Sequence, residues 1–237
     1  MKTIRKDKKN NRKIKGKVLV EAQGIGKRYR SGTQIFDVLQ KVNLVIREGD
    51  FIALLGPSGS GKTTLLRCLC GAEKNTGGDI YIAGEHLDTM KEDERTKLRG
   101  ELMGFLFGTI NVLPVLTILD NVQVMHQLQH TTRDSRKRAE EALAEVGIID
   151  GYSRKPDELD NLDKQKVALA RAIVHRPSIL WADEPTAMLH SSQAAEFIDL
   201  LKYICSKHRI ACIIATHNPN VAAKTSRIFR LESGMIV

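Results

Sequence analysis

The chain has 237 residues, of which 42% are hydrophobic and 27% are charged. That composition is ordinary for a globular protein and excludes wholesale disorder, and only six prolines and 18 glycines exclude collagen-like and low-complexity sequences. The formal net charge is +9, and no stretch approaches the ~18 apolar residues expected of a membrane span.

Most of the positive charge lies in one segment at the start of the chain. Residues 1–17 hold nine Lys and Arg side chains and one acid, Asp7, so they carry +8 of the net charge. We predict a basic flexible arm over residues 1–17 and a nearly neutral folded domain over residues 18–237. The arm is compatible with an anionic membrane surface, with nucleic acid or with a solvated tail. The neutral remainder gives no reason to expect a specific nucleic-acid partner.

The expected elements alternate between apolar strands and helices. Short apolar runs broken by turn signals predict antiparallel strands within residues 18–45, and the run FIALL predicts a strand at 51–55 that is buried on both faces. Further strands are expected at residues 80–83, 103–107, 178–182, 210–215 and 226–231. Helices are expected at residues 62–69, 133–146, 163–174 and 191–207. This order predicts an α/β lobe, a helical insertion over about 109–176 and a return to the α/β lobe.

The four cysteines lack the spacing of a disulfide framework or of a C-x-x-C site. We therefore expect reduced and mostly buried thiols, as in a cytosolic protein. They are Cys68, Cys70, Cys205 and Cys212.

Residues 56–63 read GPSGSGKT and match the phosphate-binding pattern G-x-x-x-x-G-K-[ST] in full. Glycines let successive backbone N–H groups surround an anion, and the helix N-terminus adds a partial positive charge. Lys62 is expected to reach the β- and γ-phosphates, the Thr63 hydroxyl to ligate Mg²⁺, and Thr64 to contact the α-phosphate. The other loop residues expected to bind the nucleotide are Gly56, Ser58, Gly59, Ser60 and Gly61.

Two acids follow a second apolar strand. Asp183 is positioned to hold Mg²⁺, and Glu184 can polarise an attacking water as a general base. His217 follows the next strand and can hydrogen-bond a γ-phosphate oxygen, although an ordinary histidine would fit there too. Tyr29, upstream of the loop, can stack on adenine or pack within the fold.

Together these motifs resemble the ATPase subunit of ABC transporters. The resemblance is carried, in order, by GPSGSGKTTLL, LTILDNV, ILWADEPT and ATHNP, and residues 111–118 resemble most the subgroup serving lipoprotein release, macrolide efflux and cell division. It covers about residues 18–237 and implies an α/β P-loop NTPase (RecA-like) core with an antiparallel β-subdomain and an inserted helical subdomain. It also implies that Tyr29 stacks on adenine, that Glu184 is the general base and that His217 is the switch histidine.

The resemblance implies an ATP-binding and ATP-hydrolysing subunit, with ATP and Mg²⁺ as cofactors, that powers export or extraction of lipoprotein or another substrate. Two such subunits would sandwich two ATP molecules head to tail on integral-membrane permease subunits, at the cytoplasmic, inner face of the cell membrane. Two alternatives stay open. One is a hydrolysis-poor, nucleotide-dependent clamp or regulator, and the other is a nucleic-acid- or ribosome-associated protein, which the basic arm supports.

Three motifs depart from the family pattern. The family's glutamine after the strand at 103–107 is Gly108 here, which supplies no ligand. The signature LSGGQ aligns with LDNLD at residues 159–163, and the family's Leu-Asp pair in the D-loop reads Leu189 and His190.

The signature and the D-loop act, in the family, on the nucleotide of the partner subunit. Asp160 is a good N-cap, but together with Asp163 it makes the anion-binding end of the following helix acidic. Leu162 is expected to fill space that a glycine leaves open. These departures predict asymmetric composite sites formed with a different, consensus-type ABC subunit, and a homodimer remains the alternative.

Overall fold

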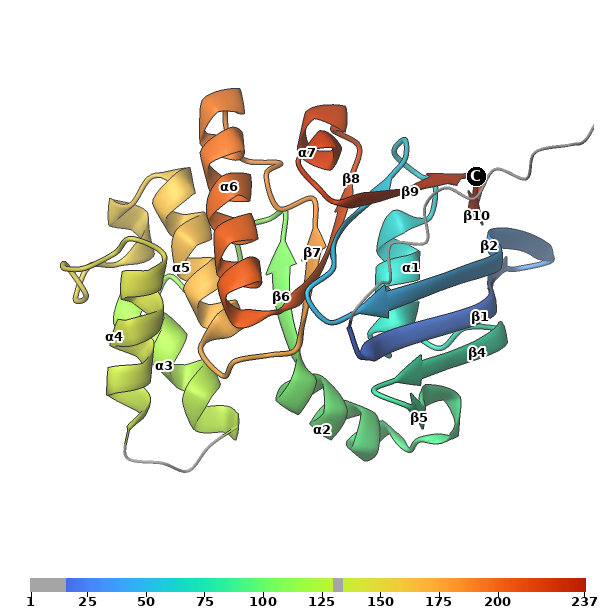
Figure 1. Cartoon of the computed structure of the whole chain (residues 1–237), viewed down its shortest axis with the longest axis horizontal. Coiled ribbons are helices and arrows are strands. Elements are labelled where there is room, and N and C mark those ends of the chain that lie inside the picture. Colours follow the sequence, from blue (N-terminus) through green and yellow to red (C-terminus); the bar gives the residue numbers. More distant parts are fainter. Residues whose placement is uncertain (1–15, 130–133) are drawn as a thin grey trace, which may run out of the picture.

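The computed structural model describes residues 16–129 and 134–237 and contains two sheets within them (Figure 1). A four-stranded antiparallel sheet has the order β2-β1-β4-β5, from β1 (Val18–Ser31), β2 (Gln34–Arg47), β4 (Gly77–Ile82) and β5 (Glu85–His86). The second sheet has the order β10-β9-β3-β8-β7-β6 and is parallel except for β10. Its strands are β3 (Phe51–Leu55), β6 (Met103–Phe107), β7 (Ile179–Asp183), β8 (Ala211–Thr216), β9 (Arg227–Glu232) and β10 (Met235–Ile236).

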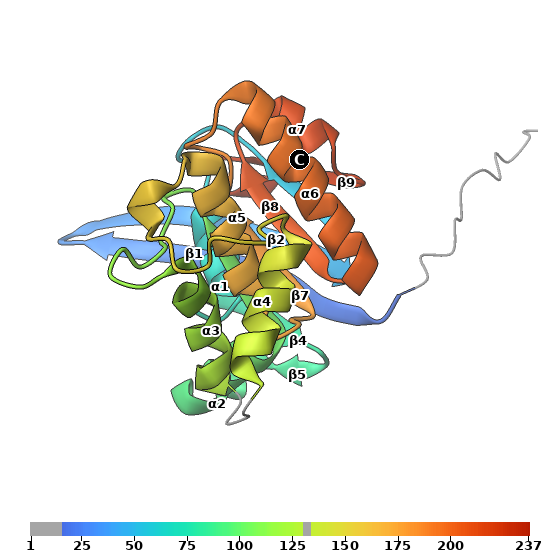
Figure 2. The same ribbon diagram turned by 90° about the vertical axis from the view of Figure 1, so that its left-hand side faces the viewer.

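Helices cover both faces of the parallel sheet. Successive residues of β7 point to opposite faces, so Leu180 belongs to the core beneath α5 and α6, whereas Trp181 belongs to the core beneath α1. Figures 1 and 2 show α3, α4 and α5 gathered at one end of the molecule and the antiparallel sheet at the other. The helices are α1 (Lys62–Leu69), α2 (Glu92–Leu102), α3 (Ile118–Gln129), α4 (Ser135–Glu145), α5 (Asn161–Ile173), α6 (Ser191–His208) and α7 (Pro219–Ala223), with short 3₁₀ turns at Leu87–Thr89 and Pro156–Glu158.

The order of elements expected from the sequence is confirmed, with small shifts at their ends. For example, the helix expected from residue 163 begins at Asn161, because the Asp160 carboxylate accepts a hydrogen bond from the Asp163 backbone and caps the helix there.

All four cysteines are free and buried, as expected. The predicted arm lies outside the described residues except for Gly16 and Lys17, and the Lys17 carbonyl already accepts a hydrogen bond at the start of the fold.

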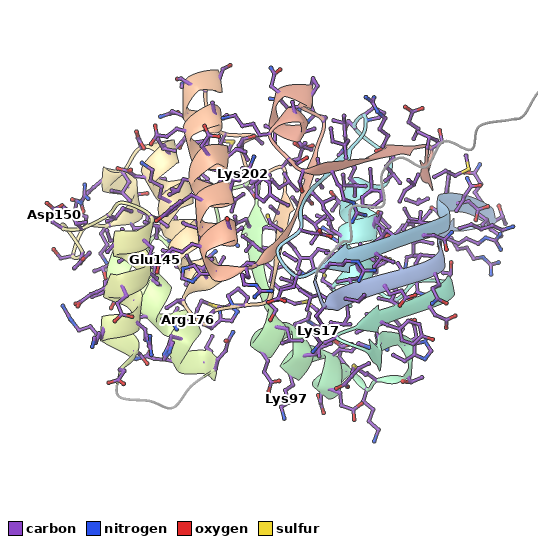
Figure 3. All side chains as sticks on the ribbon, viewed as in Figure 1. Lys17, Lys97, Glu145, Asp150, Arg176 and Lys202 are labelled. Atoms are coloured by element: carbon purple, nitrogen blue, oxygen red, sulfur yellow. The ribbon has the colours of Figure 1, made fainter. Side chains whose placement is uncertain are left out.

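Charged side chains cover the outside of the helices, as Lys97 on α2 illustrates in Figure 3. Among the described residues, the helices are all too short or too polar to cross a bilayer.

Gly104 in β6 lies at a close approach between the parallel sheet and α5. A Cβ atom there would lie 2.3 Å from the Ala172 carbonyl oxygen and 2.9 Å from a methyl carbon of Leu180. We expect Gly104→Ala to lower the free energy of unfolding by about 3 kcal/mol, since neither backbone nor packed leucine can retreat freely. The control is Gly100→Ala in α2, where a Cβ has no neighbour within 4 Å and should stabilise the helix by about 0.5–1 kcal/mol. Urea denaturation measures both, and similar values for the two variants would contradict the expectation.

Candidate functional site

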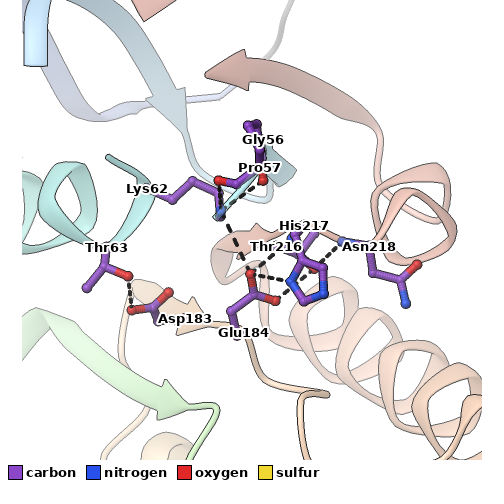
Figure 4. Close-up of polar contacts among 9 residues, drawn as sticks. All are labelled: Gly56, Pro57, Lys62, Thr63, Asp183, Glu184, Thr216, His217 and Asn218. Carbon is purple, nitrogen blue, oxygen red and sulfur yellow. Dashed lines mark hydrogen bonds and ion pairs between the residues drawn. The ribbon is translucent and has the colours of Figure 1, made fainter. Parts of the chain in front are cut away.

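The loop between β3 and α1 forms a concave turn at the carboxyl edge of the parallel sheet. Gly59 and Gly61 have φ angles of 79° and 102°, a region that favours glycine. The ammonium group of Lys62 donates hydrogen bonds to the Gly56 carbonyl at 2.8 Å and to the Pro57 carbonyl at 2.9 Å (Figure 4). Lys62 therefore lies across the loop, in reach of an anion bound by its backbone N–H groups.

A cavity of about 420 Å³ opens in front of this loop. It is lined by Val38, Ser58, Gly59, Gly61, Lys62, Thr63, Thr64, Glu184 and His217. The structure thus brings together most of the residues expected to bind phosphate with Glu184, which is expected to act on water, and with His217, which is expected to bond the γ-phosphate. Ser60 is buried in the same loop, and its hydroxyl has no hydrogen-bond partner among the described residues.

The two residues predicted to hold Mg²⁺ are in direct contact. The Thr63 hydroxyl donates a 2.7 Å hydrogen bond to Asp183 Oδ2 (Figure 4). The other carboxylate oxygen, Oδ1, is buried and has no partner among the described residues. Burial raises the pKa of the Asp183 carboxyl, although the hydrogen bond from Thr63 acts in the opposite direction. An unpartnered carboxylate oxygen beside a hydroxyl fits the oxygen ligands that Mg²⁺ prefers.

Glu184 is oriented through both carboxylate oxygens. Its Oε1 accepts a 3.0 Å hydrogen bond from the His217 backbone and lies 2.9 Å from His217 Nδ1, and its Oε2 accepts a 3.2 Å bond from Thr216 (Figure 4). Oε1 also lies 3.9 Å from the Lys62 ammonium. Glu184 has a φ of 49°, a costly conformation for a residue other than glycine that is concentrated at functional sites.

Gly108 permits the backbone after β6 to approach Glu184 closely, a contact that the sequence does not reveal. A Cβ on this residue would lie 2.8 Å from the Glu184 carbonyl oxygen and 3.2 Å from the Glu184 Cβ. The backbone after β6 therefore rests directly against the segment that carries the two acids, and a glutamine at position 108 would require that segment to move.

The N-terminal end of α5 is acidic, but the expectation for Leu162 is wrong. Asp160 caps the helix by accepting a 2.8 Å hydrogen bond from the Asp163 N–H, and both carboxylates lie at this end. Leu162 is 7% exposed and packs inward with Leu159 among the buried residues beneath α5. Its side chain therefore leaves the outer surface of the helix end open, because the first turn of α5 directs it into the core. Asn161 donates to the Met188 carbonyl at 3.0 Å.

Tyr29 lies near the end of β1 and is 38% exposed, outside the residues that line the cavity. The ammonium of Lys27 lies 4.9 Å from the centre of its ring. Burial raises the pKa of the Tyr29 hydroxyl most, and the hydrogen bond to Glu73 raises it further.

The sequence does not identify Val38 as a cavity residue, because an isolated valine in a strand carries no signal of such a role.

Replacing Asp183 by asparagine is expected to stabilise the protein while weakening its Mg²⁺ binding. Asparagine keeps an oxygen that accepts the Thr63 hydrogen bond but carries no charge. The free-energy cost of burying a carboxylate charge is therefore removed, and the melting temperature should rise by roughly 1–4 °C. The gain should shrink as the pH is lowered toward the raised pKa of Asp183, because a protonated carboxyl has no charge to bury. Scanning calorimetry at several pH values checks this, with Asp150→Asn on the exposed surface as the control. A lower melting temperature for Asp183→Asn at neutral pH would contradict it.

Comparison with known proteins gives consistent matches over most of the chain. The family model of the ABC transporter matches residues 39–187. The lipoprotein-releasing system ATP-binding protein LolD of Francisella tularensis subsp. holarctica is 35% identical over 219 residues, which cover 92% of this chain and 95% of LolD. The macrolide export ATP-binding/permease protein MacB 1 of Yersinia pestis is 36% identical over 92% of this chain and 34% of its own length.

Solved structures match the fold as well. The dimeric ATP-binding cassette MJ0796 of Methanocaldococcus jannaschii, in a post-hydrolysis state bound to ADP and Pi, is 34% identical with a TM-score of 0.84. The match covers 92% of this chain and 96% of MJ0796. CbiO1 of Clostridium perfringens, part of the ABC transporter complex CbiONQ, is 26% identical with a TM-score of 0.85 over 93% of this chain and 87% of its own.

Proposed function

Because the chain belongs to the ABC transporter family of ATP-binding proteins, we propose that it binds ATP with Mg²⁺ and hydrolyses the ATP to power a membrane transport complex. One observation supports this proposal most strongly: a single cavity is lined by Lys62, Thr63, Glu184 and His217, with Asp183 hydrogen-bonded to Thr63 and Glu184 in contact with His217. The names of the relatives LolD and MacB favour two kinds of transport as the process driven by ATP. These are extraction of a lipoprotein or another substrate, and export.

The chain's own residues supply three actions on the nucleotide. Lys62 exchanges its bonds to the Gly56 and Pro57 carbonyls for phosphate oxygens, with the loop N–H groups around them. Thr63 and Asp183 would hold the metal ion, which when bound would neutralise charge on the phosphates. The Ser58, Gly59, Ser60 and Thr64 positions complete the phosphate loop, and Tyr29 stacks on adenine.

Glu184 takes a proton from the attacking water, and two neighbours keep its carboxylate aimed. Thr216 holds one carboxylate oxygen and His217 the other, so that rotation of the carboxylate is restricted. His217, whose side chain is 65% exposed, is free to bond a γ-phosphate oxygen and to register its departure.

A permease segment docks, in this proposal, in a groove beside the metal pair. The groove has a volume of about 470 Å³, and Phe107, which is 41% exposed, lies on its rim. Thr63 and Asp183 are among its lining residues, so that an occupant would touch the same residues that are proposed to bind Mg²⁺. The other lining residues are Leu66, Arg67, Cys70, Ala72, Glu73, Phe105, Leu106 and Trp181. Such docking would keep the subunit at the inner face of the cell membrane.

The matched variants Phe107→Asp and Tyr203→Asp test this docking. Phe107 lies at the groove, whereas Tyr203 is 61% exposed on α6, which covers the opposite face of the sheet. Purification of the tagged subunit from its native membranes, with mass spectrometry of the chains that accompany it, should recover permease chains with the wild type and with Tyr203→Asp but not with Phe107→Asp. Recovery of the permease with all three would refute the groove, and its absence from all three would refute the transport function.

The second subunit is proposed to be a consensus-type ABC ATPase rather than another copy of this chain. The supporting observation is the acidic end of α5, where Asp160 and Asp163 would face the nucleotide of a partner. A homodimer would have this acidic end at both sites and would act as a hydrolysis-poor clamp. The helical subdomain that contributes it spans about residues 109–176 in this proposal, within a domain of residues 18–237.

A further inference from the structure

The outer half of the β1–β2 hairpin carries two exposed aromatic side chains on one face. Tyr29 and Phe36 are directly opposite each other across the two strands, and cross-strand partners project from the same face of a sheet. They are 38% and 49% exposed. Arg30 pairs with Ile35, which therefore places Ile35 on the other face of the hairpin. Figure 2 shows this hairpin extending beyond the body of the molecule.

The face that carries Phe36 looks toward the phosphate-loop cavity. Leu39 pairs with Lys27, and Phe36 pairs with Tyr29, two residues further along β1, so Leu39 and Phe36 project from the same face. The Leu39 side chain on this face would lie 3.1 Å from a Cβ on Gly61 of the loop. On the other strand, Lys27 precedes Tyr29 by two residues and forms a 2.8 Å ion pair with Glu73, on the side of the hairpin that faces α1. The strand register advances from Lys27–Leu39 to Arg28–Asp37, so Val38 is an extra, bulged residue at the point where the hairpin passes the loop.

The exposed aromatic pair thus lies on the face of the hairpin that contacts the phosphate loop. The Val38 carbonyl oxygen would lie only 2.9 Å from a Cβ on Gly61, so the hairpin is in close contact with the loop at that point. A nucleotide whose phosphates occupy the loop must place its base farther along this face. Lys27 lies 4.9 Å from the centre of the Tyr29 ring, which leaves the base only the opposite side of that ring.

We propose that Phe36 forms a second aromatic wall of the nucleobase site and adds affinity for the base of a nucleotide whose phosphates occupy the loop. This inference rests on the proposed function and adds a contact to it, since Tyr29 alone presents one free ring face. A purine between these side chains buries aromatic surface that the nucleotide-free protein leaves in water, and stacking on aromatic rings is favourable for any base with a large π-face.

Binding of ATP and of inorganic tripolyphosphate by Phe36→Ala tests the proposal, with Ile35→Ala as the matched control. Ile35 is the adjacent exposed apolar residue on the opposite face of the same hairpin. By isothermal titration calorimetry of the full chain with Mg²⁺, Phe36→Ala should raise the Kd for ATP about tenfold. It should leave the Kd for tripolyphosphate unchanged. Ile35→Ala should change neither, and Phe36→Trp should restore the affinity for ATP.

The outcomes separate this inference from the proposed function. Equal ATP affinities for Phe36→Ala, Ile35→Ala and the wild type would overturn the role of Phe36 and leave ATP binding intact. Equal weakening of ATP and tripolyphosphate binding would overturn it too, because the effect would then not involve the base. A wild-type chain that binds tripolyphosphate but not ATP would overturn both the nucleobase site and the proposed function.

Discussion

Glu184→Gln is expected to lower ATP turnover in the assembled complex by about 10²–10⁴-fold, the usual contribution of a general base, while ATP affinity stays close to that of the wild type. Glutamine keeps the size of the side chain, and its carbonyl oxygen can still accept from the His217 backbone or from Thr216. What it loses is the capacity to accept a proton from water. The geometry therefore survives and only the chemistry is removed.

The experiment compares steady-state ATPase activity with equilibrium ATP binding in purified complexes. Glu232→Gln, at an exposed position of β9, serves as the control for loss of a surface acid. A Glu184→Gln variant that retains more than a tenth of wild-type turnover would show that Glu184 is not the base. If the wild-type complex itself bound ATP without turnover, the chain would be the nucleotide-dependent clamp rather than the motor.

Local sequence patterns predict the alternation of strands and helices wherever an element carries its own signal, whereas α2 and α7 are not predicted from them. The run FIALL is apolar throughout, and the strand it forms, β3, lies between β8 and β9 in the middle of the parallel sheet. Glycine at positions 59 and 61 supplies the backbone angles that the loop needs before α1 begins at Lys62. The candidate site followed from the same patterns, since carboxyl ends of parallel strands meet at one edge of the sheet.

Contacts between segments distant in the chain could not be predicted in this way. The sequence predicts only that Gly108 supplies no ligand, and the fold shows in addition that Gly108 lies against the backbone of Glu184, 76 positions further along. The alignment predicts that Leu162 fills space at the helix end, but the direction of its side chain depends on how α5 packs against the buried residues around it. The alignment of Phe36 with Tyr29 depends on strand register, which a bulge at Val38 shifts by one residue.

Restoring a neutral signature is expected to raise ATP turnover about twofold with a consensus-type partner, which already provides one working site, and about tenfold or more in a homodimer, where both sites are relieved of repulsion. The structure dictates which residues to restore. The variant combines Asp160→Ser, Asn161→Gly and Asp163→Gln. Each carboxylate within ~4 Å of a phosphate charge opposes binding by about 1–4 kcal/mol, so removing two of them relieves the repulsion at the partner's nucleotide. Serine preserves the N-cap of α5. Leu162 stays unchanged, because it is 7% exposed in the core and a glycine there would cost several kcal/mol of stability.

The ATPase rate of the assembled complex distinguishes the two kinds of dimer. With a consensus-type partner, the wild type already has one working site, in which its own Glu184 faces an intact signature, and the triple variant adds the second site. With two copies of this chain, both sites change together and the rise should be larger, from a lower starting rate. Asp157→Ser, an exposed acid in the turn before α5, is the control. An unchanged rate in the triple variant would mean that Asp160 and Asp163 do not face a phosphate, and the asymmetric arrangement would then be wrong.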